Sequence, residues 1–220
     1  MSRVTELPET AADAAIPLVP VGLRVTDRAV LVVGAGPIAA RKATAYVTNG
    51  AVVTVVAPHH GPEMDRLPVA HRIRRGFQPG DLDGMWLAVT ATGIPSVDGA
   101  VFAEAETRRI WCNAADDPEH CSVLLPAVVR RGPVTIGIAS GGTSPAVASW
   151  LRRRIEALLD DRTLAVAEVT ARVRRAVRDA GHRTEVPGWS EVLDDRALDL
   201  VAAGQPEELE RELFAAVVGS

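Results

Sequence analysis

The chain has 220 residues, of which 47% are hydrophobic and 24% charged, with a net charge of −4 and a pI near 5.8. These values predict a globular protein of one large or two small domains, and the acidic balance argues against a general nucleic-acid binder. With two cysteines, no CxxC pair, no signal-peptide pattern and no apolar run of ~18 residues, we expect a cytoplasmic protein without a membrane span.

Residues 1–15 are acidic and aperiodic, which predicts a loose leader, and 16–23 resemble an extended lead-in. Strand and helix patterns then alternate, with helices predicted from Pro37 to the Asn49-Gly50 cap signal and over 95–108. Strands are predicted at 29–33, 51–57, 71–77, 85–91 and 109–115. This alternation predicts an α/β fold with a Rossmann-like, doubly wound parallel sheet.

Beyond residue 115 the pattern changes. A turn-rich loop at 116–122 precedes two extended segments within 123–140, which flank Arg131-Gly132-Pro133. From Pro145 onward the pattern is helical, with breaks near 181–188 and at 204–206.

The motif Gly34-x-Gly36-x-x-Ala39 follows a predicted buried strand and opens a helix, which is the context of a dinucleotide fingerprint. Gly34 permits a tight turn, and Gly36 lets the backbone approach a pyrophosphate held at the helix N-terminus. A plain strand-to-helix turn is the alternative. Arg41 and Lys42 lie beyond the first helical turn, so we interpret them as surface or substrate-side charges and not as pyrophosphate clamps.

The acidic residue that normally binds the ribose hydroxyls about 20 residues further on is missing. The corresponding stretch reads Ala57-Pro58-His59-His60, so backbone groups of Pro58 and His59 are the expected ribose contacts. Two solvated loop histidines are the equal alternative. On these grounds alone, the choice between NAD and NADP stays open.

A second glycine turn, Ser140-Gly141-Gly142-Thr143, precedes the helix that begins near Pro145. Its backbone N–H groups suit a carboxylate or phosphate. Helix capping, with Ser144 as the N-cap, is an equally good interpretation of this Ser/Thr cluster.

The loop "CNAADDPEHC" follows the carboxyl end of a predicted strand, where ligands of open α/β sheets bind. Asp116 is therefore placed to act as a base or to bind a metal, whereas Asp117-Pro118 is typical of a turn. His120 and Cys121 have poor ligand spacing, so we predict no tight metal site and a buried, inert Cys121.

Five segments together resemble the precorrin-2 dehydrogenase / sirohydrochlorin ferrochelatase family, the N-terminal module of siroheme synthase. They are "VLVVGAGPIAARK", "GAVVTVVAP", "LAVTAT", "RRIWCNAADDPEHCSVLLPAVVRRG" and "IASGGTSPAVASWLRRRIEALL". The resemblance implies NAD-dependent oxidation of precorrin-2 to sirohydrochlorin by a homodimer. Some family members also insert Fe²⁺ or Co²⁺ into the product, so the metal would be a substrate and not a resident ion.

The resemblance also implies roles for individual residues. Asp116 matches the family's catalytic aspartate, and Ser140 matches a serine that is phosphorylated in some members. The expected cofactor contacts are Gly34, Gly36, Pro37, Ile38, Pro58, His59, Ala91 and Thr92. The expected substrate contacts are Asn113, Ser140, Gly141, Gly142 and Thr143.

We therefore expect the chain to be divided into four segments. These are a leader at 1–15, an NAD-binding domain at 16–122, a dimerisation and substrate segment at 123–160, and a helical C-terminal domain at 161–220. We expect no fused methyltransferase domain, no nucleic-acid partner and no membrane partner. Gly93 and Asp98 depart from the residues common in the family. They keep open a tetrapyrrole-binding chaperone that has lost catalysis. A non-enzymatic NAD(H)-sensing module whose helical C-terminus binds a partner or DNA is the other alternative.

Overall fold

The computed structural model describes residues 16–115, 117–142 and 144–219. The described residues of 19–125 form one compact unit, and those of 126–219 form a second together with residues 16–18. Within the described ranges, no helix is long and apolar enough to cross a bilayer. Asp116 and Thr143, both predicted as site residues, lie outside the described residues.

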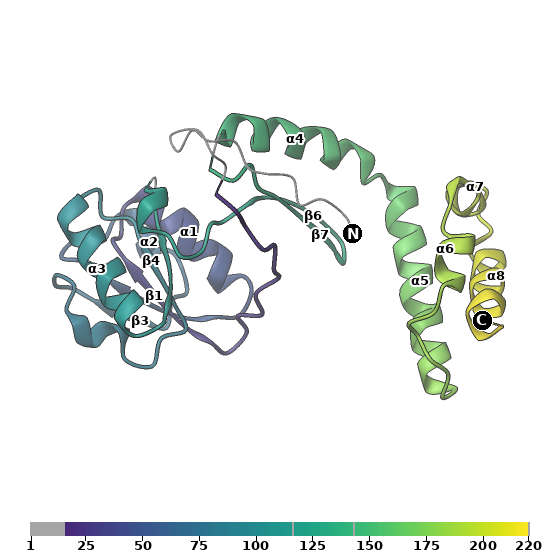
Figure 1. Ribbon diagram of the computed structural model, residues 1–220, viewed down its shortest axis with the longest axis horizontal. Helices are drawn as coiled ribbons and strands as arrows, with labels where there is room; N and C mark the ends of the chain where they lie inside the picture. The colour runs from purple at the N-terminus through teal and green to yellow at the C-terminus, as the bar shows by residue number, and fades with distance from the viewer. Residues whose placement is uncertain (1–15, 116, 143, 220) are drawn as a thin grey trace, which may run out of the picture. The chain divides into compact units, whose positions relative to one another are not determined.

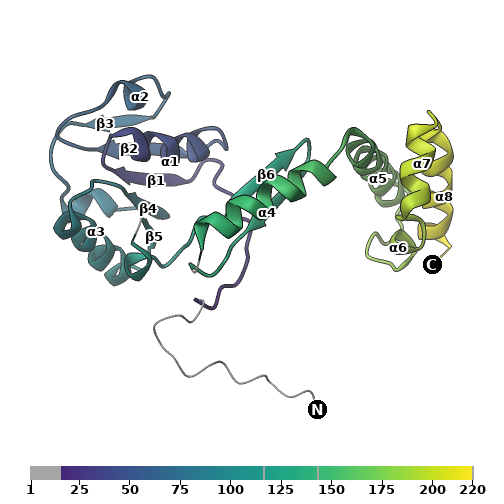
Figure 2. The same cartoon turned by 90° about the horizontal axis from the view of Figure 1, so that it is seen from above.

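The N-terminal unit is built on a parallel sheet with the strand order β3-β2-β1-β4-β5 (Figure 2). The strands are β1 (Ala29–Val33), β2 (Val52–Val56), β3 (His71–Ile73), β4 (Leu87–Thr90) and β5 (Trp111–Ala114). The helices and 3-10 turns are α1 (Pro37–Val47), α2 (Pro62–Asp65), η1 (Pro79–Leu82), α3 (Pro95–Thr107) and η2 (Pro118–His120). Each predicted strand is present, and all but β1 are shorter than predicted by two to four residues.

The central strand β1 is buried on both faces, because its side chains alternate between two hydrophobic cores. Val30 and Val32 pack in the core that contains the small residues of α1. Leu31 and Val33 pack in the core that contains Val101 and other α3 side chains. Helices therefore cover both faces of the sheet, which confirms the predicted doubly wound fold.

The strand order places a topological switch between β1 and β4. The chain leaves β1 through α1 toward β2, and it leaves β4 through α3 toward β5, on the other side of the sheet. The carboxyl ends of β1 and β4 therefore lie side by side where the two crossovers diverge. Ligands of open α/β sheets bind at such a point.

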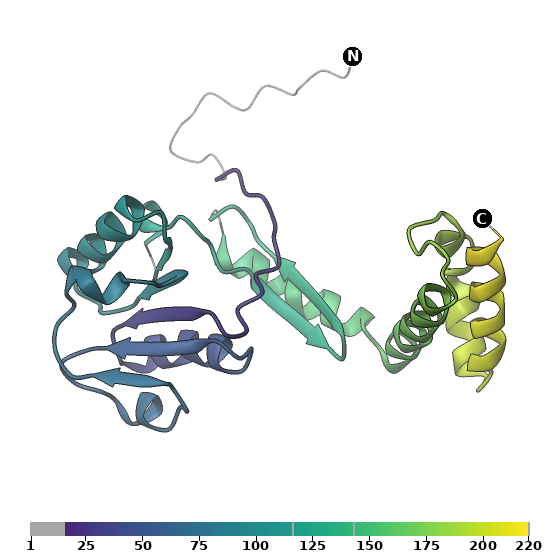
Figure 3. The ribbon, with the colours of Figure 1, turned by 90° about the horizontal axis from the view of Figure 1, so that it is seen from below.

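The second unit begins with an antiparallel hairpin, β6 (Ala127–Arg131) and β7 (Val134–Ile138), which lies along α4 (Pro145–Leu158) in Figure 3. Val129 and Ile138 of the hairpin pack against Ala148 and neighbouring residues of α4. The two predicted extended segments are therefore the two strands of one hairpin.

The remaining helices, labelled in Figure 1, are α5 (Asp161–Asp179), α6 (Gly188–Val192), α7 (Asp195–Ala202) and α8 (Pro206–Val218). Val169, Val173 and Val177 line one face of α5 and pack against Leu209 and Leu213 of α8. The sequence pattern missed the break between α4 and α5. There, Asp160 caps α5 by accepting a hydrogen bond from the Thr163 N–H at 2.9 Å.

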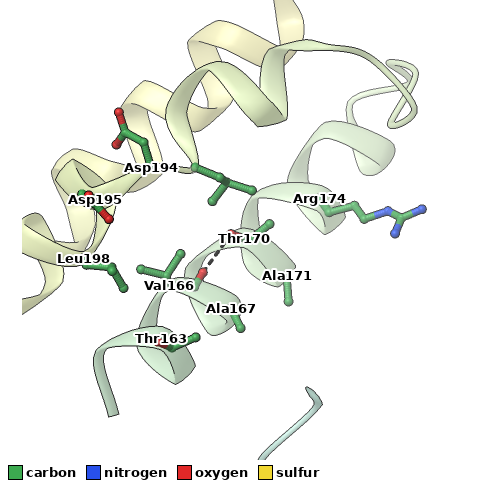
Figure 4. A pocket seen from close by; sticks show the side chains of 10 residues that line it. Thr163, Val166, Ala167, Thr170, Ala171, Arg174, Asp194, Asp195 and Leu198 are labelled. Atoms are coloured by element: carbon green, nitrogen blue, oxygen red, sulfur yellow. Dashed lines mark hydrogen bonds between the residues drawn. The ribbon is translucent and has the colours of Figure 1, made fainter. Parts of the chain in front are cut away.

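An open groove of about 680 Å³ lies between α5 and α7 (Figure 4). Small and apolar side chains such as Ala167, Ala171 and Leu198 line it, with Arg174 and Asp195 at its edge. None of the predicted site residues that the structure describes lines this groove.

Tyr46 of α1 yields a stability prediction. Its phenol is buried and its hydroxyl has no hydrogen-bond partner among the described residues, and burial raises the pKa of Tyr46 to about 12. Tyr46→Phe should therefore raise the free energy of unfolding by about 1 kcal/mol in urea titrations at neutral pH. Tyr46→Ala, as the control, should lower it by about 3–5 kcal/mol.

The raised pKa also predicts how stability depends on pH. The folded state keeps the Tyr46 phenol protonated at pH values at which the unfolded chain already ionises it. The contribution of this protonated phenol to the free energy of unfolding is therefore complete below pH 10, and it is lost as the pH rises toward 12. Tyr46 is the only tyrosine, so phenolate absorbance reports it directly. An ordinary titration near pH 10 in the folded protein, or a destabilised Phe variant, would contradict this assignment.

Candidate functional site

The turn after β1 is packed tightly against the end of β4. Gly34 has a φ of +105°, and a Cβ at this position would stand 2.4 Å from the Ala91 carbonyl oxygen. The Gly34 N–H donates to the Val56 carbonyl at 2.9 Å, so the turn is also tied to the end of β2. Only glycine fits both this backbone conformation and this contact.

The N-terminus of α1 is open to a ligand. Its N-cap is Gly36 in an extended conformation, with no side-chain cap, and Pro37 occupies the first helical position. A Cβ on Gly36 would meet no described atom within 4 Å. The N–H groups of the first turn, which include Ile38, thus face a cradle that a pyrophosphate can fill.

The Ala91-Thr92 turn is held in place by a buried carboxylate. Asp98 is 8% exposed, and its Oδ1 accepts hydrogen bonds from the Thr90 hydroxyl, the Thr92 hydroxyl at 2.8 Å and the Thr92 N–H at 3.2 Å. The Asp98 carboxylate therefore has an evident structural use. It orders the segment that packs against Gly34.

The two histidines after β2 have different environments. Pro58 and His59 are exposed, as a solvated loop requires. The His60 side chain is fully buried, and its Nδ1 lies 3.8 Å from the Asp65 carboxylate of α2. The solvated alternative is therefore wrong for His60, because the turn into α2 carries its ring inward.

The end of β5 holds a buried amide beside a cation. Asn113 is 3% exposed, and its Oδ1 accepts a 2.7 Å hydrogen bond from the Lys42 ammonium of α1. The Asn113 amide nitrogen donates to the Val123 carbonyl at 2.9 Å. The sequence pattern missed this role of Lys42. The available signal was a charged side chain at the edge of the helical stripe formed by Ala39, Ala43 and Tyr46.

The loop after β5 is internally bonded. His120 Nδ1 lies 2.6 Å from the Asp117 carboxylate, and this hydrogen bond lowers the pKa of Asp117. The Cys121 thiol lies 3.1 Å from the Ala114 N–H and is partly buried, and burial raises its pKa. Among the described residues, no group of three or more His, Cys, Asp and Glu side chains is placed to hold a metal ion.

The second glycine turn belongs to the other unit. The Ser140 hydroxyl bonds to both the N–H and the carbonyl of Ser144, at 3.2 and 3.0 Å, and the Ser144 hydroxyl accepts from the Val147 N–H to cap α4. Gly141 and Gly142 both have positive φ values. The capping interpretation thus holds for Ser144, while anion binding at this turn stays a prediction.

The first unit brings most of the predicted residues to one edge of its sheet. The residues that follow the carboxyl ends of β1, β2 and β4 are Gly34, Gly36, Pro37, Ile38, Pro58, His59, Ala91 and Thr92. Asn113 lies near the carboxyl end of β5, which is separated from β1 by β4. This edge of the sheet therefore carries both the N-terminal N–H groups of α1, which can bind an anion, and the hydrogen-bonded pair of Lys42 and Asn113 at β5.

Two family models match the chain. A model described as putative NAD(P)-binding matches residues 21–127, and one described as sirohaem biosynthesis protein central matches residues 131–158. The first match covers the sheet and its cradle, and the second begins at the last residue of β6 and covers β7 and α4. The N-terminal unit is thus an NAD(P)-binding domain.

Curated relatives agree with both matches. Siroheme synthases of Photorhabdus laumondii and Methylobacillus flagellatus are 35% and 37% identical over 88% and 86% of this chain, which spans 42% and 41% of their lengths. A solved structure described as SirC, precorrin-2 dehydrogenase, has the same fold, with a TM-score of 0.71 and 23% identity over 89% of this chain and 98% of that one. The chain is therefore similar in sequence to part of these siroheme synthases, over less than half of their length, and it shares the fold of that solved structure.

Proposed function

We propose that this chain oxidises precorrin-2 to sirohydrochlorin with NAD as the hydride acceptor. The observation that carries the proposal is the open cradle at Gly36, at the same sheet edge as the loop that contains the predicted base Asp116. The relatives named siroheme synthase and the neighbour named precorrin-2 dehydrogenase support this choice of substrate.

The residues of the cradle fit a dinucleotide. The first-turn N–H groups of α1 would bind the pyrophosphate, Gly36 would allow its close approach, and the Ala91-Thr92 turn would line the other side. Pro58 and His59 would lie against the ribose through backbone groups. Without an acidic ribose ligand on β2, the choice of NAD rests on the family likeness.

Oxidation removes two hydrogens from the tetrapyrrole, one as a hydride and one as a proton. Bound oxidised nicotinamide supplies the acceptor for the hydride. Asp116 would accept the proton, since a carboxylate at a strand's carboxyl end is a suitable general base. Asn113 and the Ser140-Gly141-Gly142-Thr143 turn would bind the substrate, whose peripheral carboxylates suit backbone N–H groups.

We also propose the predicted homodimer in the cytoplasm and the predicted division of the chain at 122 and 160. Helix α4 supports the dimer, because Val147, Trp150 and Leu158 leave an apolar stripe exposed, with Trp150 48% and Leu158 72% accessible. Exposed apolar stripes of this kind are typical of protein interfaces. Insertion of Fe²⁺ or Co²⁺ stays a prediction of the resemblance, for which Asp116 would accept the pyrrole protons.

Two glycine variants test the cofactor site. Gly36→Ala should leave the free energy of unfolding unchanged, since its methyl group meets no protein atom, but it should weaken NAD binding at least about tenfold by blocking the pyrophosphate. Gly34→Ala should instead destabilise the fold by about 2 kcal/mol or more, through its backbone conformation and its clash with Ala91. Calorimetric NAD titration and urea unfolding separate the two effects. Undiminished NAD affinity in Gly36→Ala would refute the cradle.

Adjacent aspartates test the base. Asp116→Asn should lower kcat for NADH formation about 100-fold or more with NAD affinity unchanged, because it removes the proton acceptor. Asp117→Asn is the matched control. It removes a carboxylate from the same loop, where Asp117 bonds His120, and should cost only a few-fold. Full activity in Asp116→Asn would rule out this base.

A further inference from the structure

Lys42 is an unusual residue in this chain. Of the 24 lysine and arginine residues, Lys42 is the only lysine. The other basic positions, including the neighbouring exposed Arg41, all carry a guanidinium. An ammonium is a compact point donor, whereas a guanidinium is a wide planar fork, so the two are not interchangeable at a confined contact. A lysine at this one position indicates a local requirement for its geometry.

The contact that Lys42 makes is confined. Its ammonium donates to the Asn113 side-chain oxygen at 2.7 Å, across 71 residues of sequence, and Asn113 is almost fully buried. The other end of the amide is fixed as well, because its nitrogen donates to the Val123 carbonyl and lies 3.6 Å from the Cys121 sulfur. A flipped amide would place its N–H groups against the ammonium, so this arrangement has one orientation.

Asn113 and Val123 are the two ends of the loop that carries Asp116. The ends are tied together, since the Ser122 and Val123 N–H groups donate to the Cys112 carbonyl at 2.9 and 3.1 Å. Cys112 N–H in turn donates to the Ser122 hydroxyl at 2.8 Å. Lys42 thus bonds to the residue at which this closed loop begins, from a helix whose N-terminus forms the dinucleotide cradle.

The charge of Lys42 reaches into this loop. It acts on the Cys121 thiol, where it opposes the effect of burial on the thiol's pKa. Asp116 follows Asn113 by three positions in the sequence, and three residue steps limit their Cα separation to about 11 Å. At such range a positive charge favours the ionised form of a carboxylate. The other charged groups of the loop are the mutually bonded Asp117 and His120, and the exposed Glu119.

We propose that Lys42 is a positioning residue for the proposed dehydrogenase reaction: held on the Asn113 amide, its ammonium fixes the loop that carries Asp116 and keeps that aspartate ionised. This role rests on the proposed function, in which Asp116 accepts the proton. With this role, α1 would have two functions. Its first turn would hold the cofactor, and Lys42 in its second turn would hold the loop that contains Asp116.

The test compares Lys42→Met, Lys42→Arg and the neighbouring Arg41→Met. In Lys42→Met we expect kcat to fall about tenfold with the KM for NAD unchanged, and the acidic limb of the kcat–pH profile to move up by at least about 0.5 pH unit. Lys42→Arg keeps the charge, so the limb should stay in place while kcat still falls. Arg41→Met should leave the limb at its wild-type position.

Two readouts need no substrate. Amide hydrogen exchange of peptides that cover 112–123 should quicken about tenfold in Lys42→Met and remain at the wild-type rate in Arg41→Met. Labelled lysine gives a single side-chain resonance, which Asn113→Ala should shift. Wild-type exchange, kcat and acidic limb in Lys42→Met would overturn the positioning role. Absence of NADH formation by the wild-type chain is a different outcome and would overturn the proposed function.

Discussion

The close contact between Gly34 and the Ala91 carbonyl is the constraint on which the site depends. It brings the turn after β1 against the turn after β4, at the point where the two crossovers of the sheet diverge. No other residue meets both the backbone angle and the spacing at Gly34. This contact fixes where α1 begins, and the position of α1 sets the rest of the sheet edge.

Helix α1 links the two chemical parts of this edge. Its uncapped N-terminus provides N–H groups for an anion, and Lys42, in its second turn, reaches the Asn113 amide at the end of β5. At the carboxyl end of β4, the Asp98 carboxylate accepts hydrogen bonds from the Thr90 and Thr92 hydroxyls and so orders the turn that follows the strand. The proposed oxidation would need a hydride acceptor and a proton acceptor held in a fixed relation, and a single helix anchored at both places would provide it.

Local patterns predicted the parts of this protein that local physics determines. The continuous apolar run of β1 and the glycine turn after it could be recognised from the sequence, because burial on both faces and a positive φ allow few residue types. The break at Asp160 was missed, since a cap interrupts a helical pattern without changing its composition. The burial of His60 and the Lys42–Asn113 hydrogen bond depend on tertiary contacts, and that hydrogen bond spans 71 residues of sequence. Such contacts leave no periodic pattern in the sequence from which they could be predicted.

In the proposed function, the cradle and the β5 loop serve one hydride-transfer reaction. The most direct measurement follows NADH absorbance and the tetrapyrrole spectrum together, when the wild-type chain is mixed anaerobically with NAD and a limiting amount of precorrin-2. We predict equal amounts of NADH and sirohydrochlorin, with no reaction when NAD is omitted. Binding of both ligands without NADH formation would contradict the claim and would indicate a sensing or tetrapyrrole-carrying module.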